Sequence, residues 1–391
     1  SVVPCLYTRK GINVAVFVDD LLIATDCAET RASFIREFKT HFAIRDYPDV
    51  DSYLGMSVHQ DASGISLSMP GYVSKLLEAT GMSDCNSQST PAEKGLRLSR
   101  EDEAAPAEYQ LNGQTYRTVC GSLLWCCLAC RPDCAAVVSM LCRHVARPTK
   151  KSWEAAKRVI RYLKGTADRG IKYSRYGHLS AYSDASWGDG DSARSTTGYC
   201  ILLGGAAIDW KSRLQSTVAQ STCEAECLAL AECVTEVTYV RSLLDELGID
   251  ISKPTPVHVD NKGAVDDSHN KSGRRTRHVN IKFHAVREAV RHGEVKVVKV
   301  RGGVSADTEQ IADVFTKATS RVVHDTLIPR IMGLPSRDPK VAGADRSPPA
   351  GDPAASPTRA RTATATVGGT NATARGSILR APIGRISRRN C

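Results

Sequence analysis

The stretch that decides the fold runs from Leu179 to Ser212 and reads LSAYSDASWGDGDSARSTTGYCILLGGAAIDWKS. Three short runs rich in apolar, aromatic and β-branched residues are separated by polar or glycine-rich segments, and Gly204-Gly205 joins the last two runs. This pattern predicts three consecutive β-strands, the second and third of which are connected by a tight turn.

The segment downstream alternates between helical and strand patterns. A long helix is predicted to follow, with an apolar face formed by Leu230, Val234, Val237, Val240, Leu244 and Leu247, and to end at Gly248. The remaining elements are a strand at 256–260, a helix at 284–293, a strand at 294–300 and a last helix at 308–317. Three consecutive strands followed by this alternation predict a mixed sheet covered by helices.

Four acidic residues lie at or near the ends of these elements: Asp184, Glu226, Asp260 and Asp313. Carboxylates that converge on one face of a sheet repel one another unless cations neutralise them. Mg²⁺ prefers such oxygen ligands, and two ions about 4 Å apart can promote hydrolysis of a phosphodiester. The alternative is that these are four ordinary surface acids. Their placement at the ends of successive strands and helices argues against it.

A second acidic feature lies near the start of the chain, in the stretch VAVFVDDLLIA at residues 14–24. Its two apolar runs predict two buried strands joined by a tight turn, with Asp19 and Asp20 at the tip. Both carboxylates could approach one metal ion there. Aspartate is also a common turn former, so a simple polar turn is the alternative.

Charge and cysteine content restrict the class of protein. The net charge of +10 is concentrated at residues 335–391, which carry +7, whereas the other 334 residues carry +3. Fourteen cysteines in a long chain with no apolar signal segment favour a reducing compartment over a disulfide framework. Cys127 and Cys130 have a zinc-like spacing, but without a matching second pair we expect them to pack as small apolar residues.

The motifs resemble the Pol polyproteins of copia-type long-terminal-repeat retrotransposons over about 320 residues. Residues 182–230 resemble the ribonuclease H domain, and VDNKGA (259–264), RHVNIKFHAVRE (277–288) and EQIADVFTKA (309–318) continue the match in the same order. VFVDDLLIA (16–24) is similar to the catalytic hairpin of reverse transcriptase, and SYLGMSV (52–58), residues 70–91 and residues 116–166 are similar to the palm, thumb and connecting segments that follow it.

The resemblance implies a fold class and a domain order. The expected fold is α/β, a ribonuclease H-like mixed five-stranded sheet with flanking helices, preceded by a partial reverse transcriptase palm and thumb region of α+β type. The implied boundaries are a truncated palm at 1–95, a helical thumb or connection at 96–175, the ribonuclease H-like domain at 176–325 and a disordered tail rich in Arg, Ala, Pro and Thr at 335–391.

The resemblance also implies site residues and activity. Asp184, Glu226, Asp260 and Asp313 would be catalytic and would hold two Mg²⁺ ions, with Mn²⁺ as an alternative, to cleave the RNA strand of RNA–DNA hybrids. Glu224 competes with Glu226, and Ala229, three residues beyond Glu226, favours the latter. Asp19 and Asp20 would be half of a polymerase site. The family's further aspartate lies on an earlier strand, so we expect no DNA synthesis unless an upstream segment is supplied.

A cluster of basic residues is expected to contact the substrate. The residues expected to contact nucleic acid are Lys271, Arg274, Arg275, Arg277, Lys282 and Arg287. Trp187 and Trp210 could stack on a base, although their place among strands favours core packing. Many ribonucleases H have a histidine in the loop before the last helix that assists product release; this loop has none here, and either His278 or His284 could replace it, although a purely structural role is favoured for both. We expect RNA–DNA hybrid as partner, no membrane, association with the rest of a Pol polyprotein and an intracellular location, in cytoplasmic virus-like particles or the nucleus. The sequence leaves oligomeric state open. The rival hypothesis is a non-catalytic nucleic-acid-binding remnant.

Overall fold

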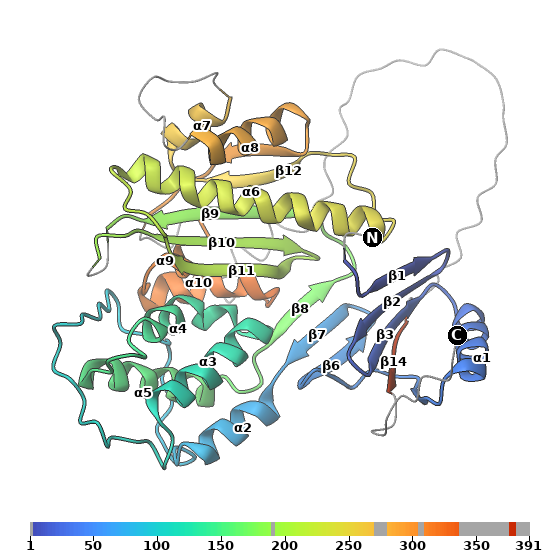
Figure 1. Cartoon of the computed structure of the whole chain (residues 1–391), viewed down its shortest axis with the longest axis horizontal. Helices are drawn as coiled ribbons and strands as arrows, with labels where there is room; N and C mark the ends of the chain where they lie inside the picture. The colour runs from blue at the N-terminus through green and yellow to red at the C-terminus, as the bar shows by residue number, and fades with distance from the viewer. Residues whose placement is uncertain (1–2, 189–191, 270–279, 304–308, 336–374, 381–391) are drawn as a thin grey trace, which may run out of the picture. The chain divides into compact units, whose positions relative to one another are not determined.

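The computed structural model describes residues 3–188, 192–269, 280–303, 309–335 and 375–380, apart from the side chains of 280–282 and 375–380. The chain forms two compact units (Figure 1). The first unit comprises residues 1–50 with 338–391, and the second comprises residues 51–337.

The first unit is an antiparallel sheet with one helix. Its elements are β1 (Leu6–Arg9), β2 (Ile12–Phe17), β3 (Asp20–Thr25), α1 (Ala28–His41), β4 (Arg45–Tyr47) and β14 (Arg375–Arg380), and its strands lie in the order β1-β2-β3-β14-β4. Ile12, Val14 and Ile23 are buried and form a small core with Ile35 of α1. Side chains alternate along each strand, so only one face of the hairpin contributes to this core.

The hairpin formed by β2 and β3 confirms the predicted tight turn but not the predicted burial of both strands. Phe17 pairs with Asp20, which leaves Val18 and Asp19 as the connection. Phe17 is 53% exposed and Val18 is 82% exposed, so the apolar run does not end in a core. Val18 also has φ of +53°, a left-handed conformation that the two-residue turn demands and that a β-branched residue adopts only with strain.

Part of the tail expected to be disordered forms a strand. β14 pairs antiparallel with β3 and with β4, and thereby fills the space between them in the sheet. Its sequence, RGSILR, contains a short apolar pair in a region otherwise rich in Pro, Ala and Thr. Backbone hydrogen bonding to two open strand edges explains why this segment adopts a strand despite its surroundings in the sequence. The rest of the predicted tail, 336–374 and 381–391, lies outside the described residues.

The second unit begins with a small antiparallel sheet and a helical layer. The strands are β5 (Ser52–Tyr53), β6 (Met56–Asp61), β7 (Gly64–Ser68) and β8 (Ile171–Ser174), in the order β5-β6-β7-β8. The helices are α2 (Pro70–Ala79), α3 (Tyr116–Cys130), the 3₁₀ turn η1 (Pro132–Cys134), α4 (Ala135–Cys142) and α5 (Lys150–Gly165). The buried apolar residues of α5, from Trp153 to Leu163, recur with the 3.6-residue period of an amphipathic helix.

The five-stranded mixed sheet predicted from the sequence is present in the second unit. Its strands are β9 (Ser180–Ser186), β10 (Thr196–Leu203), β11 (Ala206–Leu214), β12 (Thr255–Val259) and β13 (Val295–Lys299), in the order β11-β10-β9-β12-β13. The first three pair antiparallel, and β12 pairs parallel with both β9 and β13. The associated helices are α6 (Thr222–Glu246), α7 (Lys262–His269), α8 (Asn280–Arg291), α9 (Asp313–Thr316) and α10 (Arg321–Met332).

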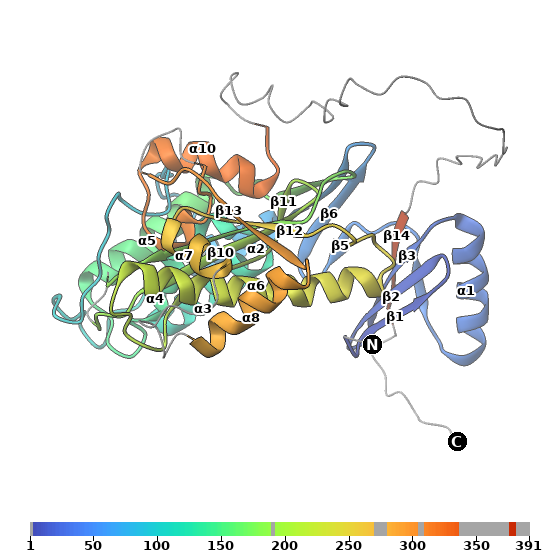
Figure 2. The same cartoon turned by 90° about the horizontal axis from the view of Figure 1, so that it is seen from above.

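Helices cover both faces of this sheet. Figure 2 shows α6 and α8 on one side and α10 on the other. The alternation along β10 explains the layering, because Tyr199 and Ile201 pack into the core under α6 and α8, whereas Cys200 packs into the core shared with α4, α9 and α10. Gly248, with φ of +74°, ends α6 as predicted. The predicted last helix at 308–317 is wrong in length, since only Asp313–Thr316 is helical there, and α10 was not predicted.

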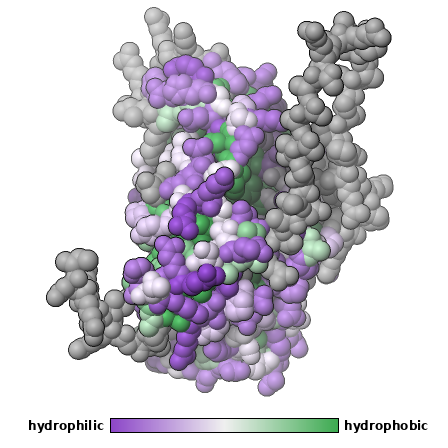
Figure 3. All heavy atoms as spheres, turned by 90° about the vertical axis from the view of Figure 1, so that its right-hand side faces the viewer, coloured by the Kyte–Doolittle hydropathy of each residue, from purple (hydrophilic) through white to green (hydrophobic). Residues whose placement is uncertain are grey.

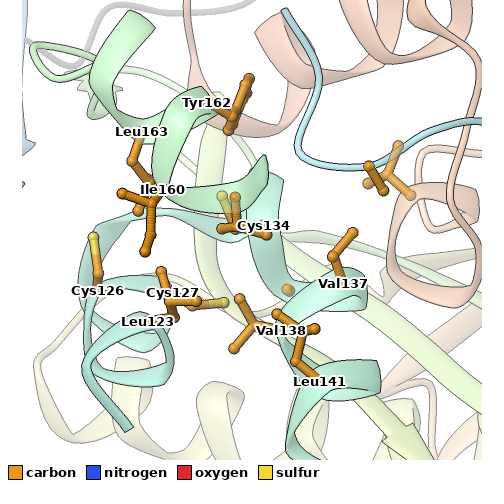
Figure 4. Packing of buried hydrophobic residues seen from close by; sticks show 14 of the residues in the cluster. Leu123, Cys126, Cys127, Cys134, Val137, Val138, Leu141, Ile160, Tyr162 and Leu163 are labelled. Atoms are coloured by element: carbon orange, nitrogen blue, oxygen red, sulfur yellow. The ribbon is translucent and has the colours of Figure 1, made fainter. Parts of the chain in front are cut away.

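The cysteine-rich segment packs as expected for apolar residues. Figure 4 shows Cys126, Cys127 and Cys134 among leucine, isoleucine and valine side chains from α3, α4 and α5. Cys127 and Cys130 are 2% and 0% exposed. Neither belongs to a cluster of potential metal ligands among the described residues, so the zinc alternative has no support from the structure.

The large core extends across the domain boundaries implied by the resemblance. One cluster of buried residues joins Met69 of the first segment, Leu163 of the helical region and Phe315 of the last segment. Strand β8 pairs with β7 across more than a hundred residues of sequence. The polar stretch at 91–110 has no named helix or strand, yet Ala92 within it is buried. The compact unit therefore runs from 51 to 337 without a break at 95 or 175.

One face of the molecule can be followed in a space-filling view. The face drawn in Figure 3 is mostly polar and carries several smaller apolar patches. Within the described ranges, no helix combines the length and the apolar character that crossing a membrane requires.

Candidate carboxylate site

Asp184 occupies the centre of the candidate site. It lies on β9, the central strand of the mixed sheet, opposite Gly198 of β10, and is 4% exposed. Thr316 of α9 donates a hydrogen bond from its hydroxyl to the Asp184 carboxylate. The approach of α9 requires Gly198, because a Cβ atom there would lie 2.6 Å from a Thr316 methyl carbon and 2.9 Å from Phe315 Cβ.

Two further acids reach Asp184 from neighbouring elements. Glu226 projects from the second turn of α6 and is 7% exposed, and Asp260 directly follows β12. One carboxylate oxygen from each of Asp184, Glu226 and Asp260 lies within 4.8 Å of the other two, close enough to share a metal ion. Gly302 makes room for Asp260, since a Cβ atom at 302 would overlap the Asp260 carboxylate.

The fourth predicted acid, Asp313, lies beside this group together with a cation. Asp313 is 1% exposed, and its Oδ1 atom lies 2.6 Å from Nζ of Lys317, one helical turn further on. The sequence analysis did not single out Lys317, although its i,i+4 spacing from Asp313 is the signal of such a pair. The ammonium group is therefore an internal counterion at the edge of the carboxylate site.

Burial and mutual repulsion shift the pKa values of these acids upward. Burial, with Asp184 and Asp260 nearby, raises the pKa of Glu226 to about 9. Burial and the Asp184 charge raise the pKa of Asp313 to about 7 and raise that of Asp260 as well. Burial lowers the pKa of Lys317, but the charges of Asp184 and its neighbours outweigh this effect, so the pKa is raised overall.

These features fit a hard divalent cation. Oε2 of Glu226 and Oδ2 of Asp313 are buried and have no protein hydrogen-bond partner. Buried carboxylate oxygens without partners are costly unless a cation binds them. The donor set is entirely oxygen, which suits Mg²⁺ or Mn²⁺ rather than a soft metal.

The structure separates the two glutamates that the sequence left in competition. Glu224 accepts a hydrogen bond from the Gln220 backbone N–H at 2.8 Å, while its own N–H bonds to the Ser221 hydroxyl at 3.1 Å. This arrangement caps the N-terminus of α6. Glu226, two residues later, points to the opposite side of the helix, where Asp184 lies.

A basic cleft opens beside the carboxylates. Its volume is about 370 Å³, and its lining includes the cations Arg97, Arg100, Arg143 and Lys317 together with His144 and Ser186. Among the residues that the structure describes, no acidic side chain lines it. The sequence alone does not point to these arginines, because Arg97 and Arg100 lie in the polar stretch between α2 and α3 and Arg143 follows α4. Only the tertiary structure brings them beside Lys317.

The other residues predicted to bind substrate are placed differently. Lys271, Arg274, Arg275, Arg277 and His278 lie outside the described residues, as does the side chain of Lys282. Arg287 is 8% exposed and donates to the Asp267 carbonyl at 2.9 Å, so the structure places it inside the protein rather than on a phosphate-binding surface. His284 is exposed on α8, and Trp187, 52% exposed, donates to the Ala219 carbonyl. Trp210 packs against the large core.

Taken together, fold and site define an α/β protein with a cluster of carboxylates beside a basic cleft. Residues 3–94 match the family model described as reverse transcriptase (RNA-dependent DNA polymerase). The chain is 33% identical over 330 residues to the retrovirus-related Pol polyprotein from transposon RE2 of Arabidopsis thaliana, and this alignment covers 83% of the chain and 22% of that protein.

Two other relatives extend the comparison. The Pol polyprotein from transposon TNT 1-94 of Nicotiana tabacum is 32% identical over 332 residues, which is 81% of this chain and 24% of that protein. A putative transposon Ty5-1 protein of Saccharomyces cerevisiae is 32% identical over 231 residues, 58% of this chain and 74% of that protein. The chain belongs to the copia-type Pol polyprotein family and has a reverse transcriptase-like region. It spans less than a quarter of the length of the two plant Pol polyproteins.

Proposed function

We propose that this chain hydrolyses the RNA strand of RNA–DNA hybrids, and that its second unit is a ribonuclease H-like nuclease. The observation that carries the proposal is the convergence of Asp184, Glu226 and Asp260 within 4.8 Å, with Asp313 beside them. Asp184, Glu226 and Asp313 are buried beside one another, and the partly exposed Asp260 lies next to them. Burying several carboxylates together costs free energy unless a cation neutralises them.

The four acids would hold two Mg²⁺ ions, or Mn²⁺, and the bound ions would supply a nucleophilic water and charge neutralisation at the scissile phosphate. The protein's own contribution is to keep the carboxylates in place. Thr316 orients Asp184 through its hydroxyl, and Lys317 orients Asp313 through its ammonium group. The mixed sheet and α9 hold these groups on rigid elements rather than on loops.

The basic cleft is the proposed path of a nucleic-acid strand. The cleft is lined by Arg97, Arg100 and Arg143 and also by Lys317, which contacts Asp313. A strand whose phosphates bind these cations would therefore run toward the carboxylates. Recognition of the RNA strand would come from its 2′-hydroxyl groups and from duplex shape rather than from base sequence. The basic segment around Arg274 to Arg277 would add further phosphate contacts.

The test is cleavage of a labelled RNA strand in an RNA–DNA hybrid, with and without Mg²⁺. We expect metal-dependent cleavage by the wild type and a loss of at least about a hundredfold in Asp184→Asn and Glu226→Gln. Glu224→Gln is the matched control, since it changes a neighbouring glutamate that caps the helix, and it should retain most activity. Binding without cleavage by the wild type would reject the nuclease and favour a non-catalytic nucleic-acid-binding remnant.

A second candidate function is RNA-directed DNA synthesis. The match of residues 3–94 to the reverse transcriptase family favours it, as does the position of Asp19 and Asp20 at an exposed hairpin tip. Primer extension on an RNA template tests it. Primer extension by the wild type that Asp19→Asn abolishes would support the polymerase. If the wild type does not extend the primer, this chain by itself is not a polymerase.

A further inference from the structure

Two cysteines and an aspartate form a second cluster of potential metal ligands, on α6 and α7. Cys223 and Cys227 are one helical turn apart on α6, so they share one face of that helix. Asp267 belongs to α7, which packs against α6 (Figure 1). One ligand atom from each of the three residues lies within 4.8 Å of the other two.

The spacing fits a tetrahedral soft metal. Zinc–sulfur bonds of about 2.3 Å place two sulfur ligands about 3.8 Å apart, and a carboxylate oxygen comes slightly closer to each. The three ligand atoms lie within 4.8 Å of one another, so small side-chain movements would bring all of them to bonding distance of one ion. Two thiolates select Zn²⁺ or Cd²⁺ over Mg²⁺, so this cluster differs in chemistry from the all-oxygen site of Asp184.

The surroundings hold the three ligands and leave an entry path. Cys227 is 3% exposed, whereas Cys223 is partly exposed to solvent. Gly263 makes room for the sulfur, because a Cβ atom at 263 would lie 2.7 Å from Cys223 Sγ. Arg287 of α8 donates to the Asp267 carbonyl at 2.9 Å and so fixes the backbone that carries the carboxylate.

We propose that Cys223, Cys227 and Asp267 bind one divalent zinc-like ion, with water completing the fourth position. Burial raises the pKa of both thiols, so each would release its proton to solvent as the ion binds. The site joins the start of α6, which carries Glu226, to α7. This inference does not depend on the proposed nuclease activity, since the ligands belong to neither the carboxylate group nor the cleft.

The test is titration of the reduced, full-length protein with Cd²⁺ in excess Mg²⁺, followed by the ultraviolet thiolate-to-metal charge-transfer absorbance. We expect one tightly bound equivalent in the wild type. Cys223→Ser should abolish this absorbance, and Asp267→Asn should weaken binding about tenfold or more. Cys27→Ser is the matched control, because Cys27 is an exposed free cysteine in the other unit, and it should bind like the wild type.

Three results would overturn the proposal: no thiolate absorbance in the wild type, undiminished absorbance in Cys223→Ser, or unchanged affinity in Asp267→Asn. Circular dichroism checks that each variant folds, and Asp267→Asn removes no thiol, so it tests the site even if Cys223→Ser is unstable. Asp184→Asn should retain Cd²⁺ absorbance while losing RNA cleavage, which separates failure of this site from failure of the nuclease.

Discussion

Glu226 and Asp313 are acids held in surroundings that favour their protonated forms. Burial is the main reason, and the neighbouring carboxylates add to it. Ionising these buried carboxylates without a cation nearby costs free energy. The stability of the second unit therefore depends on both pH and metal.

The first prediction concerns this linkage. The folded protein retains a proton on Asp313 up to about pH 7 and on Glu226 up to about pH 9, whereas the unfolded chain releases them near the ordinary pKa values of 3.8 and 4.5. Stability falls with pH wherever the folded state binds more protons, so the metal-free Tm should decrease between about pH 7 and pH 9. Adding Mg²⁺ should raise the Tm most at the alkaline end.

Differential scanning calorimetry in chelator and in Mg²⁺ measures this effect. Glu226→Gln should flatten the pH dependence, because the amide does not titrate. A metal-free Tm that stays constant or rises between pH 7 and pH 9 would contradict the prediction. Burial lowers the pKa values of His258 and His324, so these histidines change the stability only below their ordinary pKa of 6.5. The buried Asp133, whose pKa is lowered to about 2 mainly by the Arg131 charge against the opposing effect of burial, acts only at more acidic pH and does not interfere.

The second prediction concerns Lys317. Lys317→Met removes the ammonium group beside the buried Asp313 carboxylate, and should lower the free energy of unfolding by about 1–2 kcal/mol at pH 8 without metal, since the lysine is partly solvated. Urea unfolding measures the change. Mg²⁺ should stabilise this variant more than the wild type, and Lys317→Arg should restore most of the loss. Equal stability of Lys317→Met and wild type would show that the ion pair has no structural role.

At the level of elements, the site depends on how closely α9 approaches β10. This approach is possible because Gly198 has no side chain beneath Phe315 and Thr316. The sequence predicted a helix at 308–317 from its apolar pattern, but only four residues are helical, because Gln310 donates from its side chain to the Ser183 carbonyl and the Ala312 N–H bonds to that same side chain. Tertiary hydrogen bonds there replace the helical ones.

The third prediction tests this packing. Gly198→Ala should push α9 away from the sheet, lower the free energy of unfolding by about 1–3 kcal/mol and reduce RNA cleavage, because Asp313 and Thr316 move with the helix. Thermal unfolding and the hybrid cleavage assay measure both effects. Gly121→Ala in α3 is the control: a Cβ atom there meets nothing within 4 Å, so it should leave stability unchanged or raise it by about 1 kcal/mol. Similar behaviour of the two variants would contradict the packing argument.

At the level of the whole molecule, the five-stranded sheet is not an independent domain. Its second face is covered by residues from the helical region, and the same buried cluster includes Leu163 of α5, Phe315 of α9 and Leu327 of α10. The resemblance placed a boundary at 175/176, which would remove the contribution of α4 and α5 to this core and leave only α9 and α10 on that face. Stability of the site is therefore tied to residues more than a hundred positions upstream.

The fourth prediction follows from that core. A fragment comprising residues 51–337 should unfold cooperatively with native-like near-ultraviolet circular dichroism, whereas a fragment comprising 176–337 should aggregate or bind a hydrophobic dye. Expression and thermal unfolding of both fragments decide the question. A stable, cooperative 176–337 fragment would show that the implied domain boundary is functional after all.

The sequence by itself determined the local elements and their order. Periodicity located the long helix that ends at Gly248 and the hairpin around Asp19, because local patterns follow from side-chain direction in helices and strands. It also supplied the four acids, through their position at element ends and through resemblance to a family.

Only the tertiary structure decided which side chains meet. It placed Glu226 rather than Glu224 beside Asp184, set Lys317 and the arginines of the cleft at the site, buried Arg287, paired β14 with β3, and brought Asp267 to the two cysteines of α6. Each of these contacts joins residues distant in sequence, and their proximity depends on strand order and on packing across a shared core. That information is carried by the fold as a whole rather than by any local stretch of residues.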